Sequence, residues 1–114
     1  MKHAEHDLQK ACVQWFRMQH KAAYIFSVPN GGKRDLKEAV RLKAEGVVSG
    51  VADLFVMSPF SSDAKGMFIE MKTEKGKQSP TQKAFELDCR DRGYNYAVCH
   101  SLNEFMKVTI EFLQ

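Results

Sequence analysis

No stretch of this sequence is apolar over the length that a transmembrane helix requires, and cysteine is scarce. The three cysteines, Cys12, Cys89 and Cys99, lie in apolar surroundings and form no CxxC pair. An odd number without paired spacing argues against a disulfide framework and against a zinc site. We therefore expect three small core residues. The polar start of the chain, MKHAEHDLQK, is not a signal sequence, so we expect a cytoplasmic protein.

Repeats, low-complexity tracts and Pro/Gly/Ser-rich linkers are also absent. A length of 114 residues suits one soluble domain with one core, expected over residues 1–114. The net charge is only +3, but basic residues gather in two segments, 33–43 and 65–77. These segments suit an anionic partner such as DNA, although two ordinary solvated surfaces would have the same composition.

Hydrophobic periodicity and capping residues predict alternating helices and strands. Helices are expected at residues 5–20, 34–46, 80–93 and 102–113, and strands at 22–28, 50–57, 66–73 and 94–100. Ser79 with Gln82, and Ser101 with Glu104, have the spacing of a capping box. The order α β α β β α β α predicts an α/β fold, with a mixed β-sheet and helices on both of its faces.

The strands at 50–57 and 66–73 read as a hairpin whose register can be argued from burial. If Asp53 stands opposite Glu70, the pairs that follow are Leu54–Ile69, Phe55–Phe68 and Val56–Met67. Side chains alternate along a strand, so one face becomes apolar while Asp53, Glu70 and Lys72 gather on the other. A slip of one residue would bring the charges into the core.

Two carboxylates close together repel each other, and a divalent cation removes that repulsion. Oxygen ligands favour Mg²⁺ or Mn²⁺, which could lower the pKa of an attacking water beside a phosphate. A Glu-x-Lys motif in a strand is more often a solvated polar face. Asp53 in register, the two basic segments and an inward-facing Glu5 favour the metal site, although a glutamate in a first helical turn is also ordinary.

These residues resemble the PD-(D/E)XK nuclease superfamily and, within it, the VRR-NUC family of virus-type replication and repair nucleases. The resemblance runs through a helical Glu5, PNGG, GVADL, IEMK and SPTQ, in that order. One departure is Ala52, where the superfamily has a proline before the aspartate. The resemblance implies a restriction-endonuclease-like core and a small stand-alone nuclease of phage type, which would act in the cytoplasm of the host cell.

Carried over position by position, the resemblance implies a catalytic set and a metal set. Asp53, Glu70 and the main-chain carbonyl of Met71 would bind Mg²⁺ or Mn²⁺. Lys72 would be the catalytic lysine, and Glu5 and Gln82 would assist. Gln82 can equally be the return arm of a capping box.

The resulting hypothesis is a homodimeric, structure-specific endonuclease for branched DNA such as four-way (Holliday) junctions. Lys33, Arg34, Lys75 and Lys77 are the expected phosphate contacts, and Val108 and Phe112 are candidates for the dimer contact or for the core. One alternative is a non-catalytic nucleic-acid-binding module with the same fold. Another is a sequence-specific restriction-type nuclease, although the chain offers no obvious recognition domain.

Overall fold

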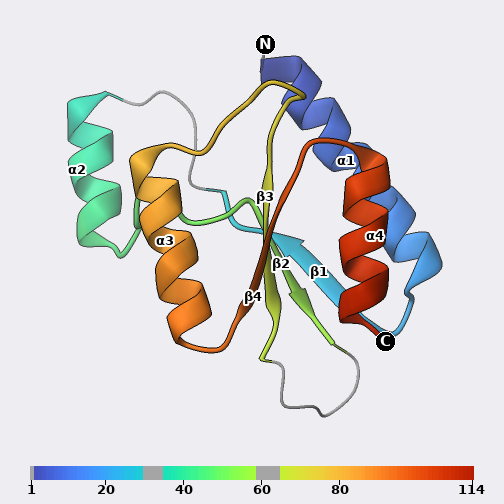
Figure 1. Cartoon of the computed structure of the whole chain (residues 1–114). Coiled ribbons are helices and arrows are strands. Elements are labelled where there is room, and N and C mark those ends of the chain that lie inside the picture. Colours follow the sequence, from blue (N-terminus) through green and yellow to red (C-terminus); the bar gives the residue numbers. More distant parts are fainter. Residues whose placement is uncertain (1, 30–34, 59–64) are drawn as a thin grey trace.

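A four-stranded mixed sheet forms the centre of the computed structural model, which describes residues 2–29, 35–58 and 65–114 (Figure 1). The strands are β1 (Tyr24–Ser27), β2 (Leu54–Met57), β3 (Met67–Met71) and β4 (Asn95–Cys99), in the spatial order β1-β2-β3-β4. β2 runs antiparallel to both β1 and β3, whereas β3 and β4 are parallel. The predicted mixed sheet is confirmed.

Helices cover both faces of this sheet, as the element order predicted. α1 (Lys2–Gln19) and α4 (Leu102–Phe112) pack against each other on one face (Figure 1). α3 (Pro80–Asp91), the crossover between β3 and β4, covers the other face. α2 (Leu36–Ala44) begins at the N-cap Asp35 and contains no buried residue.

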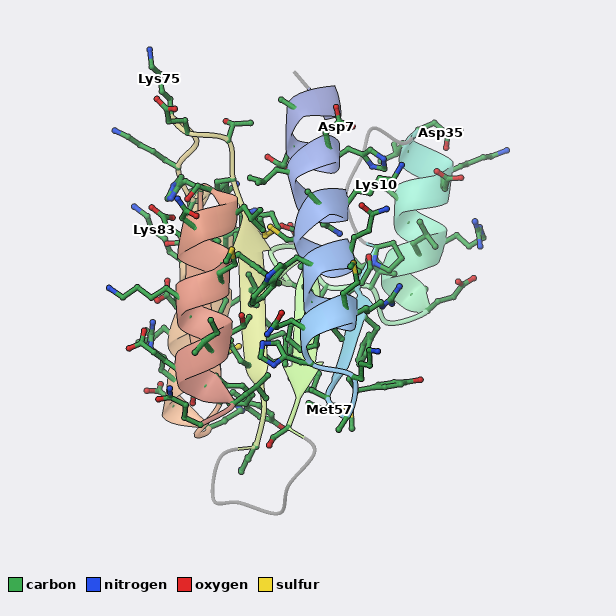
Figure 2. The ribbon with its side chains drawn as sticks, turned by 90° about the vertical axis from the view of Figure 1, so that its right-hand side faces the viewer. Asp7, Lys10, Asp35, Met57, Lys75 and Lys83 are labelled. Atoms are coloured by element: carbon green, nitrogen blue, oxygen red, sulfur yellow. The ribbon has the colours of Figure 1, made fainter. Side chains whose placement is uncertain are left out.

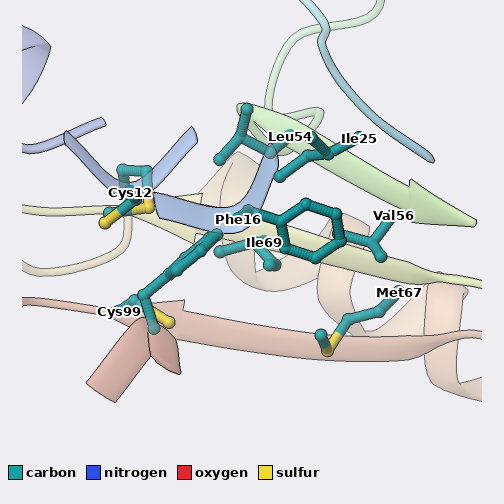
Figure 3. Packing of buried hydrophobic residues seen from close by; sticks show 10 residues of the cluster. Cys12, Phe16, Ile25, Leu54, Val56, Met67, Ile69 and Cys99 are labelled. Atoms are coloured by element: carbon teal, nitrogen blue, oxygen red, sulfur yellow. The ribbon is translucent and has the colours of Figure 1, made fainter. Parts of the chain in front are cut away.

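The larger core cluster lies between the sheet and the α1–α4 pair. Phe16 is at its centre, among alternate residues of the strands (Figure 3). Burial raises the pKa of the Cys12 thiol to about 11 and that of Cys99 to about 12, so both remain protonated. Cys89 is buried in the smaller cluster under α3, and all three cysteines are free, as expected.

The register of β2 and β3 is the one argued from burial. Leu54 stands opposite Ile69, Phe55 opposite Phe68, and Val56 opposite Met67. The strand at 50–57 is shorter than predicted and begins only at Leu54. Asp53 therefore lies just before β2 rather than inside a strand.

Gly50 brings the chain that precedes β2 close to α3. Its φ of +92° belongs to the left-handed region, and a Cβ there would collide with the main chain of Thr81 and Gln82. The segment that leads into Asp53 thus packs directly against the first turn of α3. This close approach fixes where α3 begins relative to β2.

The two predicted capping boxes turn out differently. At α3, Ser79 and Gln82 form the complete box, with Pro80 in the first turn. At α4, Ser101 accepts a hydrogen bond from the Glu104 N–H, but the Glu104 carboxylate accepts from the His100 N–H instead of from Ser101. The second prediction is therefore only half right.

Candidate active site

Asp53 and Glu70 meet where β2 begins and β3 ends. The β2–β3 register, continued by one residue, sets these two residues opposite each other. Asp53 Oδ2 accepts a hydrogen bond of 2.7 Å from the main-chain N–H of Met71. Glu70 is only 2% exposed, so its carboxyl group is held away from bulk water.

The electrostatics of this pair are unfavourable without a cation. Burial raises the pKa of Asp53, although the hydrogen bonds from the Met71 N–H and with Glu70 favour its ionised form. Burial and the Asp53 charge together raise the pKa of Glu70 to about 8, and Lys72 offsets only part of this rise. The metal-free pair therefore binds a proton more readily than two solvated carboxyl groups would.

Lys72 lies one residue beyond β3 but is still tied to the sheet. Its main-chain N–H donates to the Cys99 carbonyl at 3.0 Å, which extends the β3–β4 pairing. Its Nζ lies 3.7 Å from Glu70 Oε2, and only 15% of its side chain is exposed. An ammonium group is thus held beside the carboxylate pair.

Gln82 forms the predicted capping contact and a second contact, with Glu70, that was not predicted. Its Oε1 accepts from the Ser79 N–H at 2.7 Å, which is the return arm of the capping box. Its Nε2 donates to Glu70 Oε2, also at 2.7 Å. Because the cap occupies the oxygen of the amide, the NH₂ group is directed at the carboxylate.

The remaining predicted residues surround this centre or fall outside the described part. Glu5, half-buried in α1, is near enough for its charge to contribute to the raised pKa of Glu70. Lys75 and Lys77 are exposed on the segment after β3, and the Lys75 side chain extends away from the protein at the end where α1 begins (Figure 2). Lys33 and Arg34 lie outside the described residues.

Sequence reasoning missed Tyr96, which contacts Glu70 from β4. The Tyr96 hydroxyl donates to Glu70 Oε1 at 3.5 Å. Without the parallel pairing of β3 and β4, which the sequence did not reveal, nothing links these distant residues. The hydroxyl of a tyrosine on the strand predicted at 94–100 was the only available signal.

The donor set fits a hard divalent cation. Within residues 2–29, 35–58 and 65–114, no group of three or more His, Cys, Asp or Glu side chains could hold a metal ion. Asp53 and Glu70 thus offer two carboxylates, whose pKa values are raised chiefly by burial and only partly offset by Lys72. Mg²⁺ is commonly bound by one or two carboxylates together with water and substrate phosphate, so this pair suits it.

Comparisons with known proteins identify the fold and the family. Two solved structures described as a "VRR_NUC domain protein" and a "VRR_NUC domain" share the fold. The first has a TM-score of 0.80 and 22% identity over 96% of this chain and 87% of its own. The second has a TM-score of 0.65 and 23% identity over 95% and 96%. No curated protein matches. The family model of the VRR-NUC domain matches residues 1–103, and the chain therefore belongs to the VRR-NUC family of nucleases.

Proposed function

We propose that this protein is a Mg²⁺- or Mn²⁺-dependent endonuclease that hydrolyses phosphodiester bonds in branched DNA, four-way junctions among them. The observation that carries the proposal is the pairing of the buried Glu70 with the partly buried Asp53, with Lys72 beside them. Two carboxylates held close together with little access to water destabilise the fold when both are ionised, and a bound cation would remove that cost.

Asp53 and Glu70 would hold the metal ion, with the main-chain carbonyl of Met71 as a further oxygen ligand. When bound, the ion would supply Lewis-acid stabilisation of the phosphate and a lower pKa for an attacking water. The Met71 N–H fixes the Asp53 carboxylate through its 2.7 Å hydrogen bond. Both ligands are thus set by the main chain of β3.

Lys72 would orient the attacking water and balance the negative charge that develops on the phosphate. Gln82 would assist by holding Glu70, to which its NH₂ group donates a hydrogen bond of 2.7 Å. Glu5 would act as an outer acidic residue, near enough to affect Glu70 electrostatically. These three residues would support Asp53 and Glu70, which remain the proposed metal ligands.

The DNA would approach from the end of the molecule where α1 begins and the segment after β3 turns. Lys75 and Lys77 are exposed there. Lys33 and Arg34, which lie outside the described residues, would be further phosphate contacts. Contacts of lysine and arginine with phosphates position DNA without reading its sequence. Shape would therefore decide which DNA is cut, which argues against a restriction-type enzyme.

A homodimer would place two such sites on the two symmetric strands of a junction. Val108 and Phe112 pack against the main core, which favours the core role for them. Large apolar side chains that remain exposed, such as Tyr24, Leu36 and Val40, are the better candidates for a contact between copies. Light scattering at several protein concentrations would measure the oligomeric state.

One nuclease domain over residues 1–114, acting in the cytoplasm, is part of the same proposal. None of the helices in the described ranges is long and apolar enough to span a membrane. The family match over residues 1–103 supports a single nuclease domain.

The test is cleavage of labelled four-way junction, flap, single-stranded and linear duplex DNA in Mg²⁺, Mn²⁺ or EDTA. The wild type is compared with Lys72→Ala, whose truncated side chain no longer reaches the carboxylates. We expect cutting of branched DNA that needs metal and disappears in the variant. Binding without cutting, equal in both proteins, would instead favour a non-catalytic DNA-binding module.

A further inference from the structure

The two oxygens of the Glu70 carboxylate have different partners, and the inner one is held from β4. Gln82 and Lys72 both face Oε2, at 2.7 and 3.7 Å. Tyr96, which is 5% exposed, donates its hydroxyl to Oε1 at 3.5 Å. Glu70 is thus bracketed from α3 on one oxygen and from β4 on the other.

The direction of the Tyr96 hydroxyl is itself set by a neighbour. Gln78 Nε2 donates to the Tyr96 oxygen at 3.4 Å and to Glu86 Oε1 at 3.0 Å. An amide NH₂ has two hydrogens, so both bonds can form together. Since Gln78 occupies the acceptor side of the phenol, the phenol's own hydrogen is left for Glu70.

A closed network anchors this pair of residues. Glu86 forms a 2.8 Å ion pair with Arg90, and Arg90 donates to the main-chain carbonyl of Tyr96 at 3.1 Å. The Tyr96 ring also packs edge-on against Phe85, which like Glu86 and Arg90 belongs to α3, with 6.2 Å between ring centres. α3 therefore contacts both the ring and the main chain of Tyr96.

We propose that Tyr96 is a positioning residue that fixes the Glu70 carboxylate for metal binding, with Gln78 orienting its hydroxyl. The inference rests on the proposed metal-dependent function. Groups that hold metal ligands in place typically contribute 10- to 100-fold to metal affinity. Since 3.5 Å is long for an O–H···O bond, we expect a loss near the lower end, about tenfold.

A purely structural role for Tyr96 makes a different prediction. The ring fills the smaller core cluster, and Tyr96→Phe keeps that ring. Loss of a long hydrogen bond should barely change the thermal stability of the metal-free protein. Metal affinity should change only if the hydroxyl acts on Glu70.

The experiment is titration of the metal-free full chain with Mn²⁺, followed by calorimetry and by electron paramagnetic resonance of the free ion. Tyr94→Phe is the matched control, since Tyr94 packs in the same aromatic group, against Phe55 and Phe68. This substitution also removes one hydroxyl, but not the hydroxyl that donates to Glu70. We expect Tyr96→Phe to raise the Mn²⁺ dissociation constant about tenfold, with an unchanged melting temperature in EDTA. Tyr94→Phe should match the wild type.

A second variant keeps the test decisive if Tyr96→Phe folds poorly. Gln78→Leu leaves the tyrosine in place but frees its hydroxyl, and it should weaken Mn²⁺ binding in the same direction. The double variant should lose no more affinity than Tyr96→Phe alone, because both residues act through one hydroxyl.

The possible results separate the two proposals. Mn²⁺ affinity that is unchanged in Tyr96→Phe and in Gln78→Leu would overturn the positioning role, while the wild type still binds metal. A wild type that binds no Mn²⁺ would instead overturn the proposed function. Saturating Mg²⁺ should restore the cleavage rate of Tyr96→Phe, whereas a persistent rate defect would contradict an effect on metal affinity.

Discussion

The main-chain N–H of Met71 points at the side chain of Asp53 and donates a 2.7 Å hydrogen bond to it. The residue that leads into β2 is thereby fixed by the last residue of β3. Main-chain donors are rigid, so the Asp53 carboxylate keeps its place even when no metal compensates its charge.

Asp53→Asn should separate stability from activity. The amide oxygen can still accept from Met71, while the negative charge that raises the pKa of Glu70 disappears. We expect the unfolding free energy in EDTA to stay equal or rise, and the cleavage rate to fall at least about a hundredfold. Asp7→Asn, at an exposed position on α1, is the control (Figure 2). Undiminished cleavage by Asp53→Asn would contradict the proposed metal ligand.

The metal-free protein should lose stability as pH rises from about 5 to about 8. Glu70 keeps its proton in the folded state up to a pKa of about 8, but releases it near 4.5 when unfolded. The folded state thus binds the extra proton in this interval, and Glu70 lowers the unfolding free energy by up to about 1.4 kcal/mol per pH unit. Urea unfolding in EDTA at several pH values measures this slope.

The same measurement on Glu70→Gln provides the control for that slope. The amide cannot titrate, so its unfolding free energy should depend less on pH than that of the wild type. Excess Mg²⁺ should also flatten the wild-type curve, because a bound cation favours the ionised carboxylate. Identical slopes for the wild type and Glu70→Gln would exclude Glu70 as the titrating group.

Ser79→Ala and Gln82→Leu should distinguish helix capping from the contact with Glu70. Ser79→Ala removes the N-cap acceptor and should cost about 1 kcal/mol of stability. It leaves the Ser79 N–H that orients Gln82, so cleavage at saturating metal should remain close to wild type. Gln82→Leu should lose stability and metal affinity together. Equal metal affinity in the two variants would reduce Gln82 to a capping residue.

Gly50→Ala should weaken metal binding although Gly50 is not one of the proposed site residues. A Cβ would push against the main chain of Thr81 and Gln82 and displace the start of α3. Gly46→Ala is the matched control, because Gly46 also has a positive φ but a Cβ there would meet no atom within 4 Å. Gly46→Ala should cost about 1–2 kcal/mol from strain alone. Gly50→Ala should cost more and weaken Mn²⁺ binding; equal losses would show that the close approach is unimportant.

Lys75→Ala should weaken binding to every DNA tested by a similar factor. The salt dependence, as the slope of log affinity against log salt, should fall by about one. Lys107→Ala, at an exposed position on α4 outside the segment after β3, should leave both quantities unchanged. Fluorescence anisotropy at several salt concentrations measures them. A loss confined to one DNA sequence would indicate base contacts instead.

The β2–β3 hairpin could be predicted in detail because burial restricts its register. Only one pairing keeps Leu54 and Ile69 in the core and the charges together, and that pairing is observed. The capping box at Ser79 was equally clear, since its residues and its hydrogen bonds are local. Asp53 was wrongly placed inside a strand, because sequence patterns locate the ends of a strand less well than its centre.

Contacts between distant segments were beyond the sequence. Tyr96 reaches Glu70 only because β4 pairs in parallel with β3, and periodicity gives no sign of which strands become neighbours. The return arm from Glu104 to the His100 N–H depends on the local path of the chain before α4. Burial patterns and the capping box at Ser79 were thus readable, whereas the cap of α4 was only half predicted and the pairing across the crossover was missed.

The mixed sheet also suggests an order in which the site assembles during folding. β2 and β3 are closer in sequence than β3 and β4, so the antiparallel pair closes a shorter loop and pays less chain entropy. Asp53 and Glu70 belong to that early pair, while Gln82 and Tyr96 arrive with the crossover helix and β4. The acidic pair would then exist, for a short time in each folding event, without the two side chains that hold Glu70.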